Sequence, residues 1–194
     1  KLRMKIAIFI PVKKYTESKE RLSNILTNSE RAVLAKTMAQ KTVNAFVQAN
    51  IASTITVVTN DPHLVIQGAE IFVSTLSLNL ALEEAIANSM PFGKIMITHA
   101  DLPRINAGDI ELLCMNHSDN SITIIADEHG IGTNCLLFES TLKFKLYFGP
   151  NSFHLFQQAF KEHVFTFESP SITSLQQDLD SDDDYFKLIK YVEV

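Results

Sequence analysis

The sequence has 194 residues, a formal net charge of −5 at pH 7 and a hydrophobic fraction of 46%. This length suits one domain, and this composition is typical of a globular chain and excludes a disordered one. The negative charge excludes an overall basic surface for nucleic acid, and no apolar run approaches the roughly 20 residues that span a membrane.

The first half of the chain alternates between predicted strands and helices. Strands are expected where short runs are apolar or β-branched, at residues 4–12, 54–59, 69–73 and 93–98. Residues 13–28 between the first strand and the first helix are predicted to form a polar loop. Helices are expected from the N-cap Ser29 to about residue 49, from the N-cap Ser77 to about residue 89, and from Asn106 onward. The first helix is expected to bury one apolar face, made by Leu34, Met38, Val43, Phe46 and Val47.

The second half is richer in strands. They are predicted at residues 121–126, 134–138 and 164–167. A helix capped by Asn151 or Ser152 is expected to run to about residue 162, and a last helix follows residues 178–184 and ends near residue 191.

Alternating strands and helices predict an α/β fold, with a mostly parallel mixed sheet and helices on both faces. We expect one domain over residues 1–194. Ligands collect beyond the carboxyl ends of the strands in such sheets, so the loops after Val12, Thr98 and Ala126 are the first candidates for a site.

The two cysteines, Cys114 and Cys135, lack the spacing of a zinc site and are expected to be buried thiols in a reduced cytoplasm. No signal-peptide pattern is present. We expect Met4 to be the natural start and residues 1–3 to be an addition.

Charge is unevenly spread along the chain. Residues 1–41 carry ten of the 17 lysines and arginines but three of the 22 acidic residues. Three of these cations, Lys13, Lys19 and Arg21, lie in the loop after the first strand, where they could hold a triphosphate or a phosphorylated acid. Lys36 and Lys41 are better explained as the solvated side of a helix.

Three aspartates are candidate metal ligands. Asp101 follows an apolar strand at the edge where ligands bind, and could hold Mg²⁺ or simply cap the turn before Pro103. Asp178 and Asp180 flank Leu179, so on an extended segment both carboxylates face one side and repel unless a cation lies between them. The alternative is an acidic N-terminus for the last helix, which explains Asp178 less well.

Two glycine-containing segments could bring backbone amides close to a ligand. Residues 129–134 precede a strand and do not form a dinucleotide fingerprint, and residues 148–153 join a glycine turn to a helix N-terminus, which is either an anion site or an ordinary cap. No P-loop, nucleophile elbow or zinc-protease motif is present. His99 and His129 are of interest because of the loops in which they lie.

Together these segments resemble the 2-phospho-L-lactate guanylyltransferase family, which belongs with the molybdenum-cofactor guanylyltransferases among the nucleotidyltransferases. The resemblance covers nearly the whole chain, and its strength lies in the order and spacing of weak motifs. These motifs are Ile10-Pro-Val-Lys13, Lys19-Glu-Arg-Leu22, Val57-Val-Thr59, Leu78-Asn79, Ala81-Leu82, Ala100-Asp-Leu-Pro103, residues 130–137, Phe148-Gly-Pro-Asn-Ser-Phe153 and Asp178-Leu-Asp180.

The resemblance implies a single Rossmann-like domain that uses Mg²⁺ and GTP in coenzyme F-420 biosynthesis. The phosphate of a small acid, which is 2-phospho-L-lactate, phosphoenolpyruvate or 3-phosphoglycerate, attacks the α-phosphorus of GTP and pyrophosphate leaves. The next enzyme would be the transferase that moves the activated acid onto the deazaflavin precursor. The assembly, a homodimer included, is not fixed by the sequence.

The resemblance also implies roles for individual residues. Asp101, Lys19 and Arg21 would be catalytic. The nucleotide would be bound by Pro11, Val12, Lys13, Lys19, Leu78 and Asn79. The acceptor would be bound by Thr133, Gly149 and Ser152. The metal would be held by Asp101, Asp178 and Asp180.

Two positions depart from the family pattern. The proline that usually follows the closing Asp-x-Asp motif is absent, and Lys14-Tyr15 stands where a shorter apolar loop is common. The alternatives are a nucleotidyltransferase for a molybdopterin, sugar-phosphate or cytidylyl acceptor, and a non-catalytic nucleotide-binding protein of the same fold. The first usually has a glycine-rich loop where this chain has Pro11-Val-Lys-Lys14, and the second does not explain the three aspartates.

Overall fold

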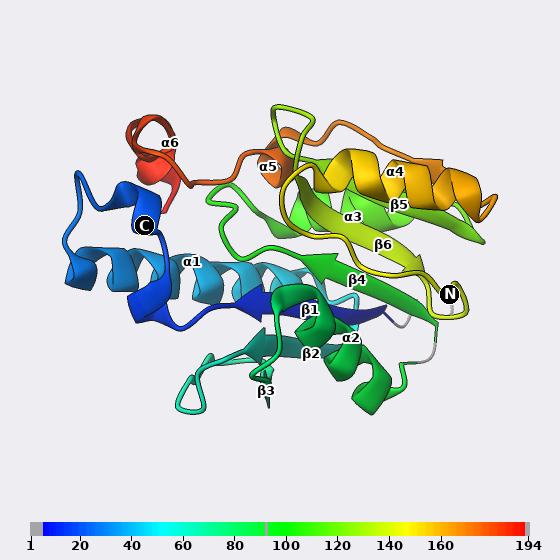
Figure 1. Cartoon of the computed structure of the whole chain (residues 1–194), viewed down its shortest axis with the longest axis horizontal. Helices are drawn as coiled ribbons and strands as arrows, with labels where there is room; N and C mark the ends of the chain where they lie inside the picture. Colours follow the sequence, from blue (N-terminus) through cyan, green and yellow to red (C-terminus); the bar gives the residue numbers. More distant parts are fainter. Residues whose placement is uncertain (1–5, 92, 193–194) are drawn as a thin grey trace.

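The computed structural model of the chain describes residues 6–91 and 93–192. Within them, seven strands form one sheet in the order β3-β2-β1-β4-β6-β5-β7 (Figure 1). The strands are β1 (Ile6–Val12), β2 (Ala52–Thr59), β3 (Glu70–Val73), β4 (Lys94–Thr98), β5 (Ser121–Ala126), β6 (Thr133–Glu139) and β7 (Thr166–Glu168). Strand β6 runs antiparallel to both β4 and β5, and the other pairings are parallel. The predicted mostly parallel mixed sheet is confirmed.

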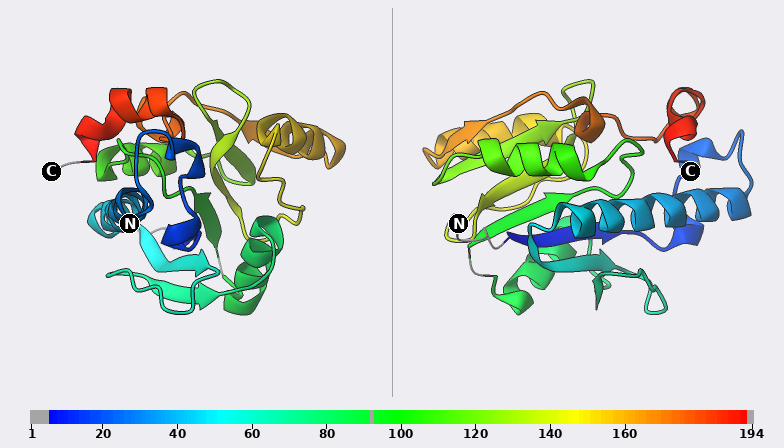
Figure 2. Two further views of the ribbon diagram at one scale, coloured as in Figure 1. Left: turned by 60° about the vertical axis from the view of Figure 1, so that its left-hand side comes forward. Right: turned by 180° about the vertical axis from the view of Figure 1, so that it is seen from behind.

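Helices cover both faces of the sheet. They are α1 (Asn28–Ala49), α2 (Leu78–Ser89), α3 (Ala107–Asn116), α4 (Ser152–Glu162), α5 (Thr173–Gln176) and α6 (Asp182–Leu188). Three 3-10 turns, η1 (Tyr15–Glu17), η2 (Glu20–Leu22) and η3 (Ile189–Tyr191), complete the described elements. Helices α2 and α4 lie in front of the sheet in Figure 1, and α1 and α3 lie in front when the molecule is seen from behind (Figure 2).

The alternation of β1 explains these two layers. Successive side chains of a strand point to opposite faces, and β1 is buried on both. Ile8 and Ile10 pack in the cluster that contains residues of α1 and α3, whereas Ala7 and Phe9 pack in the cluster that contains residues of α2 and α4. Burial on both faces fixes β1 as a central strand, and its carboxyl end therefore opens onto the middle of the sheet edge.

A third, smaller cluster joins distant parts of the chain near this edge. Leu22 of the first loop, Met38 of α1, and Leu179 and Leu188 of the C-terminal segment are all buried against one another. Burying these side chains stabilises the fold by about 25 cal/mol per Å² of apolar surface removed from water. It also carries residues 178–180 back to the loop that follows β1.

Several details differ from the sequence predictions. The N-cap of α1 is Thr27 and not Ser29, because Thr27 and Glu30 form a capping box in which each side chain bonds the other's backbone N–H. Val47 is 53% exposed and lies outside the apolar face of α1. Val164 has a left-handed φ of 58°, which is incompatible with a strand, so β7 begins at Thr166.

Residues 1–5, including the predicted start at Met4, lie outside the described residues. Cys114 and Cys135 are free and buried, as predicted. None of the helices in the described part of the chain has the length and apolar character needed to cross a membrane.

Candidate active site

The candidate site lies at the carboxyl ends of β1 and β4. Asp101 follows β4 after two residues, and its carbonyl oxygen accepts a hydrogen bond from the Leu179 N–H at 2.9 Å. This bond places the C-terminal segment with Asp178 and Asp180 beside Asp101, although nearly 80 residues separate them. The structure thus brings together the three aspartates that the family resemblance groups as metal ligands.

Lys19 lies between two of these aspartates. Its Nζ donates to Asp101 Oδ2 at 2.9 Å, to Asp180 Oδ1 at 2.7 Å and to the Leu179 carbonyl at 2.7 Å. These three acceptors match the three donors of an ammonium group. The Lys19 side chain is 8% exposed, and its backbone adopts a left-handed φ of 57°. A non-glycine residue takes that conformation at a cost, so the surrounding contacts hold Lys19 turned inward.

The charges in this cluster control one another's protonation. Burial by itself would lower the pKa of Lys19, but the carboxylates of Asp101 and Asp180 outweigh it and raise that pKa above its ordinary value. Burial would raise the pKa of Asp101, but the Lys19 ammonium and then His99 hold it below its ordinary value. The site therefore contains a buried ion pair that stays charged at neutral pH.

Asp178 is in a different state. Burial, and then the neighbouring charges of Asp101 and Asp180, raise the pKa of Asp178 to about 7. The Oδ1 atom of Asp101 is buried without a hydrogen-bond partner among the described residues. The Lys19 ammonium therefore does not satisfy the whole cluster. Asp101 Oδ1 has no partner among the described residues, and the carboxyl group of Asp178 resists ionisation.

No group of three or more His, Cys, Asp or Glu side chains is arranged to hold a metal ion within residues 6–91 and 93–192. The Lys19 ammonium occupies the position between Asp101 and Asp180. The other predicted cations differ from it, because Lys13 and Arg21 are exposed on the same loop. Lys19 alone among the three is brought into contact with the aspartates.

The predicted acceptor residues gather next to this cluster. Ser152, the first residue of α4, donates through Oγ to Thr133 Oγ1 at 3.1 Å, and both residues are buried. The Phe153 N–H donates to the Ile131 carbonyl at 3.0 Å, which joins the start of α4 to the start of β6. Gly149 precedes them with a φ of +128°, a conformation that favours glycine.

The sequence prediction missed Asp127 at the end of β5. Its carboxylate accepts hydrogen bonds from the backbone N–H groups of His129, Ile131 and Gly132, at 3.1, 2.9 and 2.8 Å. An aspartate followed by a glycine-containing turn is a known signal for such a side-chain-to-backbone turn. Asp127 therefore shapes the loop that leads to Thr133.

The sequence singled out His99 only because it lies in the loop that follows β4. Its Nε2 is buried without a hydrogen-bond partner among the described residues, and its ring centroid lies 5.2 Å from that of Phe148. The His99 N–H donates to the Asn134 carbonyl at 3.0 Å. His99 thus joins β4, β6 and the segment that precedes α4, two residues before Asp101.

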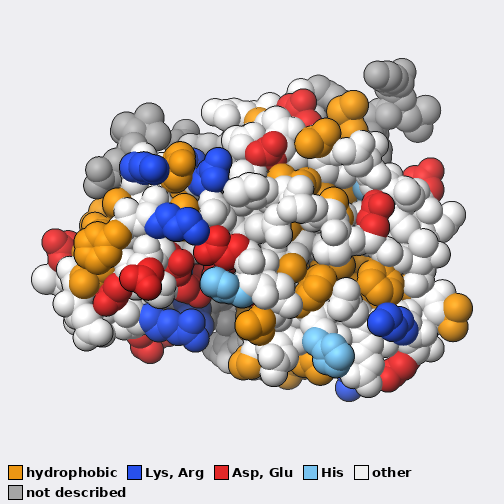
Figure 3. Space-filling model, turned by 90° about the horizontal axis from the view of Figure 1, so that it is seen from above, with side chains coloured by type: hydrophobic (Ala, Val, Ile, Leu, Met, Phe, Trp, Pro, Cys, Tyr) orange, Lys and Arg blue, Asp and Glu red, His pale blue; other side chains and the backbone are white. Residues whose placement is uncertain are grey.

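Charged side chains mark this end of the molecule. Seen from above, acidic and basic side chains lie side by side over one half of the face, and uncharged ones dominate the other half (Figure 3). Lys187 of α6 forms an ion pair with Glu128 of the loop after β5, with Lys187 Nζ 3.0 Å from Glu128 Oε2. Exposed pairs of this kind contribute little to stability, so this one mainly brings α6 to the loop after β5.

The sequence is similar over most of its length to known guanylyl transferases. The model of the family described as "Guanylyl transferase CofC like" matches residues 6–189. The chain is 32% identical to the 2-phospho-L-lactate guanylyltransferase of Methanothermobacter thermautotrophicus, over 77% of this chain and 69% of that protein. It is also 32% identical to the phosphoenolpyruvate guanylyltransferase of Chloroflexus aurantiacus, over 77% of this chain and 78% of that protein.

Solved structures share the fold at lower identity. A nucleotidyl transferase from Methanothermobacter thermautotrophicus aligns with a TM-score of 0.65 at 13% identity, over 97% of both chains. The 2-C-methyl-D-erythritol 4-phosphate cytidylyltransferase of Thermus thermophilus aligns with a TM-score of 0.60 at 10% identity, over 98% of this chain and all of the other. The fold is that of the Rossmann-like nucleotidyltransferases, and the chain belongs to the family of CofC-like guanylyl transferases.

Proposed function

We propose that this guanylyltransferase joins GMP from GTP to a small phosphorylated acid and releases pyrophosphate, as a step of coenzyme F-420 biosynthesis. The relatives named above act on 2-phospho-L-lactate and phosphoenolpyruvate, and 3-phosphoglycerate is the third candidate acceptor. The observation that carries the proposal is the cluster of Lys19, Asp101 and Asp180 at the carboxyl end of β4, where the paired strand β6 begins with Thr133 and its hydrogen bond to Ser152.

The chemistry suits these residues. The attacking phosphate is already anionic, so the site needs no strong base and must instead bring two anions together and neutralise the charge that builds up. In the proposal, Lys13, Lys19 and Arg21 meet the triphosphate. Pro11, Val12 and Leu78 line the nucleotide pocket at the ends of β1 and β3.

The acceptor is proposed to bind at Thr133, Gly149 and Ser152. The Ser152 hydroxyl donates its one proton to Thr133 Oγ1, so the Thr133 hydroxyl keeps its own proton to donate to an anionic oxygen of the acceptor. The N-terminus of α4 adds the positive end of a helix dipole.

We further propose Mg²⁺ as the cofactor, held by Asp101, Asp178 and Asp180. Two observations support it: Asp101 Oδ1 is an acceptor without a partner among the described residues, and the pKa of Asp178 is raised first by burial and then by the charges of Asp101 and Asp180. A bound Mg²⁺ supplies charge neutralisation at the transferring phosphoryl group. With the metal compensating Asp101 and Asp180, the Lys19 ammonium would be available to bind phosphate oxygens.

A coupled assay tests this function. Pyrophosphate release is measured with Mg²⁺ and GTP and with each of the three acids separately, with ATP and CTP as controls. Release with GTP and one acid establishes the reaction and names the acceptor. No release with any pair, from folded protein that binds GTP, would favour the non-catalytic alternative. A homodimer and a downstream deazaflavin transferase as partner stay predictions.

A further inference from the structure

Asn79, in the first turn of α2, is hydrogen-bonded to the backbone of a single distant residue. Its Nδ2 donates to the Phe148 carbonyl at 2.9 Å, and the Phe148 N–H donates to Asn79 Oδ1 at 2.8 Å. A side-chain amide that both donates to and accepts from one residue reproduces the paired bonds between antiparallel strands. The Asn79 side chain is thus used to fix the segment that precedes α4.

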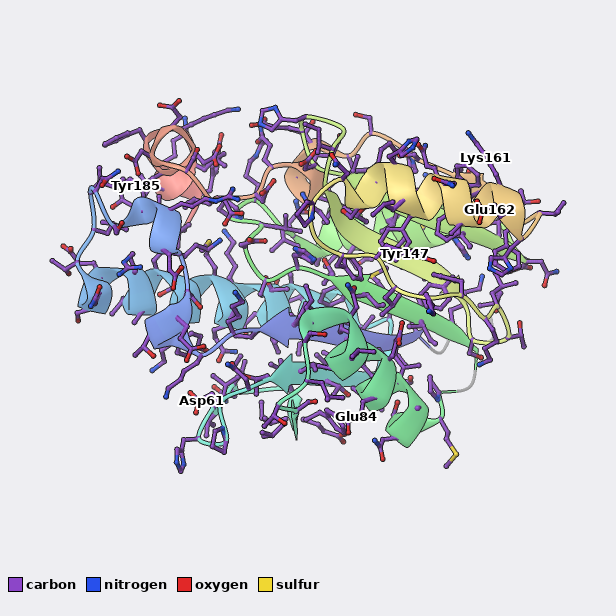
Figure 4. The ribbon with its side chains drawn as sticks, in the orientation of Figure 1. Asp61, Glu84, Tyr147, Lys161, Glu162 and Tyr185 are labelled. Atoms are coloured by element: carbon purple, nitrogen blue, oxygen red, sulfur yellow. The ribbon has the colours of Figure 1, made fainter. Side chains whose placement is uncertain are left out.

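A second residue of α2 acts on the same segment. Glu83 lies one turn after Asn79 on the same face of the helix, and its Oε1 accepts a hydrogen bond from the Leu146 N–H at 2.9 Å. On its other side the segment packs against α4, because the ring of Tyr147 (labelled in Figure 4) has its centroid 5.7 Å from that of Phe156. Residues 146–148 are therefore held between α2 and α4.

The held segment leads directly into the proposed acceptor site. Gly149 has a φ of +128° and Asn151 a φ of 56°, and such backbone conformations persist where surrounding contacts enforce them. Ser152 follows with its hydrogen bond to Thr133. On the opposite side, the Phe148 ring contacts His99, two residues before Asp101. Phe148 thus links the acceptor residues to the aspartate cluster.

We propose that Asn79 is a positioning residue for the acceptor. Through Phe148 it holds Gly149 and Ser152 at a fixed place relative to Asp101, with Glu83 as a second support. This inference rests on the proposed function and deepens it, because it assigns Asn79 to the acceptor half of the site and not to the nucleotide pocket. A shift of the acceptor by about 1 Å costs on the order of a hundredfold in rate, so a loosened support is measurable.

The kinetic test compares Asn79→Ala with the wild type. The KM for the acceptor should rise about tenfold or more while the KM for GTP changes less than about twofold. Asn79→Asp keeps the oxygen that accepts from the Phe148 N–H and loses the donor. Its KM for the acceptor should therefore lie between that of the wild type and that of Asn79→Ala. The matched control is Asn88→Ala, an exposed residue of the same helix that bonds the Glu84 carbonyl, and it should leave both constants unchanged. An equal or larger rise in the KM for GTP would overturn the proposal.

Hydrogen exchange gives a readout that does not depend on turnover. In Asn79→Ala the amide of Phe148 should lose protection together with residues 149–152, while the amides of β1 keep theirs. Unchanged protection would overturn the proposal. If the wild type turns over none of the acids, the proposed function fails while this exchange result still decides whether Asn79 fixes the turn. Should Asn79→Ala not fold, Asn79→Asp and Glu83→Ala each remove one hydrogen bond and serve in the same test.

Discussion

Lys19 Nζ lies 2.7 Å from Asp180 Oδ1, although the two residues are 161 positions apart in the sequence. The contact closes the first loop of the chain onto its C-terminal segment, with Asp101 as the third member. Two carboxylates that are partly withdrawn from water are tolerated when a cation compensates them, and here that cation is a side chain of the protein itself. We therefore expect this contact to stabilise the ligand-free protein and to determine how the protein responds to metal.

Replacing Lys19 by Met should destabilise the ligand-free protein. Removal of one partner from a fully buried pair costs about 3–5 kcal/mol, and we expect about 1–3 kcal/mol here because the Asp180 side chain is 41% exposed. Mg²⁺ or Mn²⁺ should then raise the melting temperature of the variant more than that of the wild type, since the metal replaces the lost cation. The exposed Lys36→Met is the control. If Lys19→Met had equal melting temperatures with and without metal, the metal would not occupy the position that the Lys19 ammonium takes between Asp101 and Asp180.

Gly132→Ala should disturb the loop that leads to Thr133. A Cβ atom at residue 132 would lie 2.8 Å from Asp127 Oδ2, so the carboxylate that holds three backbone N–H groups has to move. We expect a loss of about 1–3 kcal/mol in the free energy of unfolding, measured by urea denaturation. Gly108→Ala meets one side-chain oxygen at an ordinary 3.4 Å and should be nearly neutral. Identical unfolding curves for both variants would show that Asp127 is not held as described.

The stability of the protein should fall as the pH drops below about 6.5, in part because of His117. Burial, followed by the charge of Lys94, lowers the pKa of His117, and its Nε2 is buried without a partner among the described residues. The unfolded chain takes up a proton near pH 6.5 and the folded chain at a lower pH, so the stabilisation is complete above that value and is lost below it. In His117→Asn the urea midpoint should change less between pH 7.5 and 5.5 than in the wild type. A variant with the wild-type dependence would exclude His117 as the cause.

Asp101→Asn tests the proposed metal ligand. The change keeps the size of the side chain and removes the charge that pairs with Lys19, so we expect activity to fall by about a hundredfold or more. Binding of Mn²⁺ measured by electron paramagnetic resonance should weaken in parallel. Wild-type Mn²⁺ binding in this variant would remove Asp101 from the proposed set.

Local patterns were sufficient to predict much of the fold. The apolar runs located all seven strands of the described residues to within two residues, and Asp101 could be identified because it follows a buried strand at the ligand-binding edge. The caps were harder, because Ser29 and Thr27 are equally good cap residues in isolation and the capping box with Glu30 decides between them. The spacing of Asp178 and Asp180 predicted that their carboxylates face one side and need a cation. It did not predict which residues lie beside them.

The contacts of Lys19 and Asn79 could not be predicted in this way. Lys19 reaches Asp180 because Leu22 and Leu179 are buried in one cluster, and nothing in the sequence near either residue encodes that packing. Asn79 pairs with Phe148 because the segment before α4 passes over the first turn of α2. Both contacts depend on tertiary packing. For Lys19 we keep the role that the family resemblance implies, and for Asn79 we propose a different one.

In the proposed reaction the acceptor phosphate attacks the α-phosphorus of GTP. Mass spectrometry of the products from GTP, Mg²⁺ and each acid distinguishes this attack from one at another phosphorus. We expect an adduct of GMP with one of the acids, formed in equal amount with pyrophosphate and absent with Asp101→Asn. GDP and inorganic phosphate without any adduct would contradict it, because they would place the attack at the terminal phosphate.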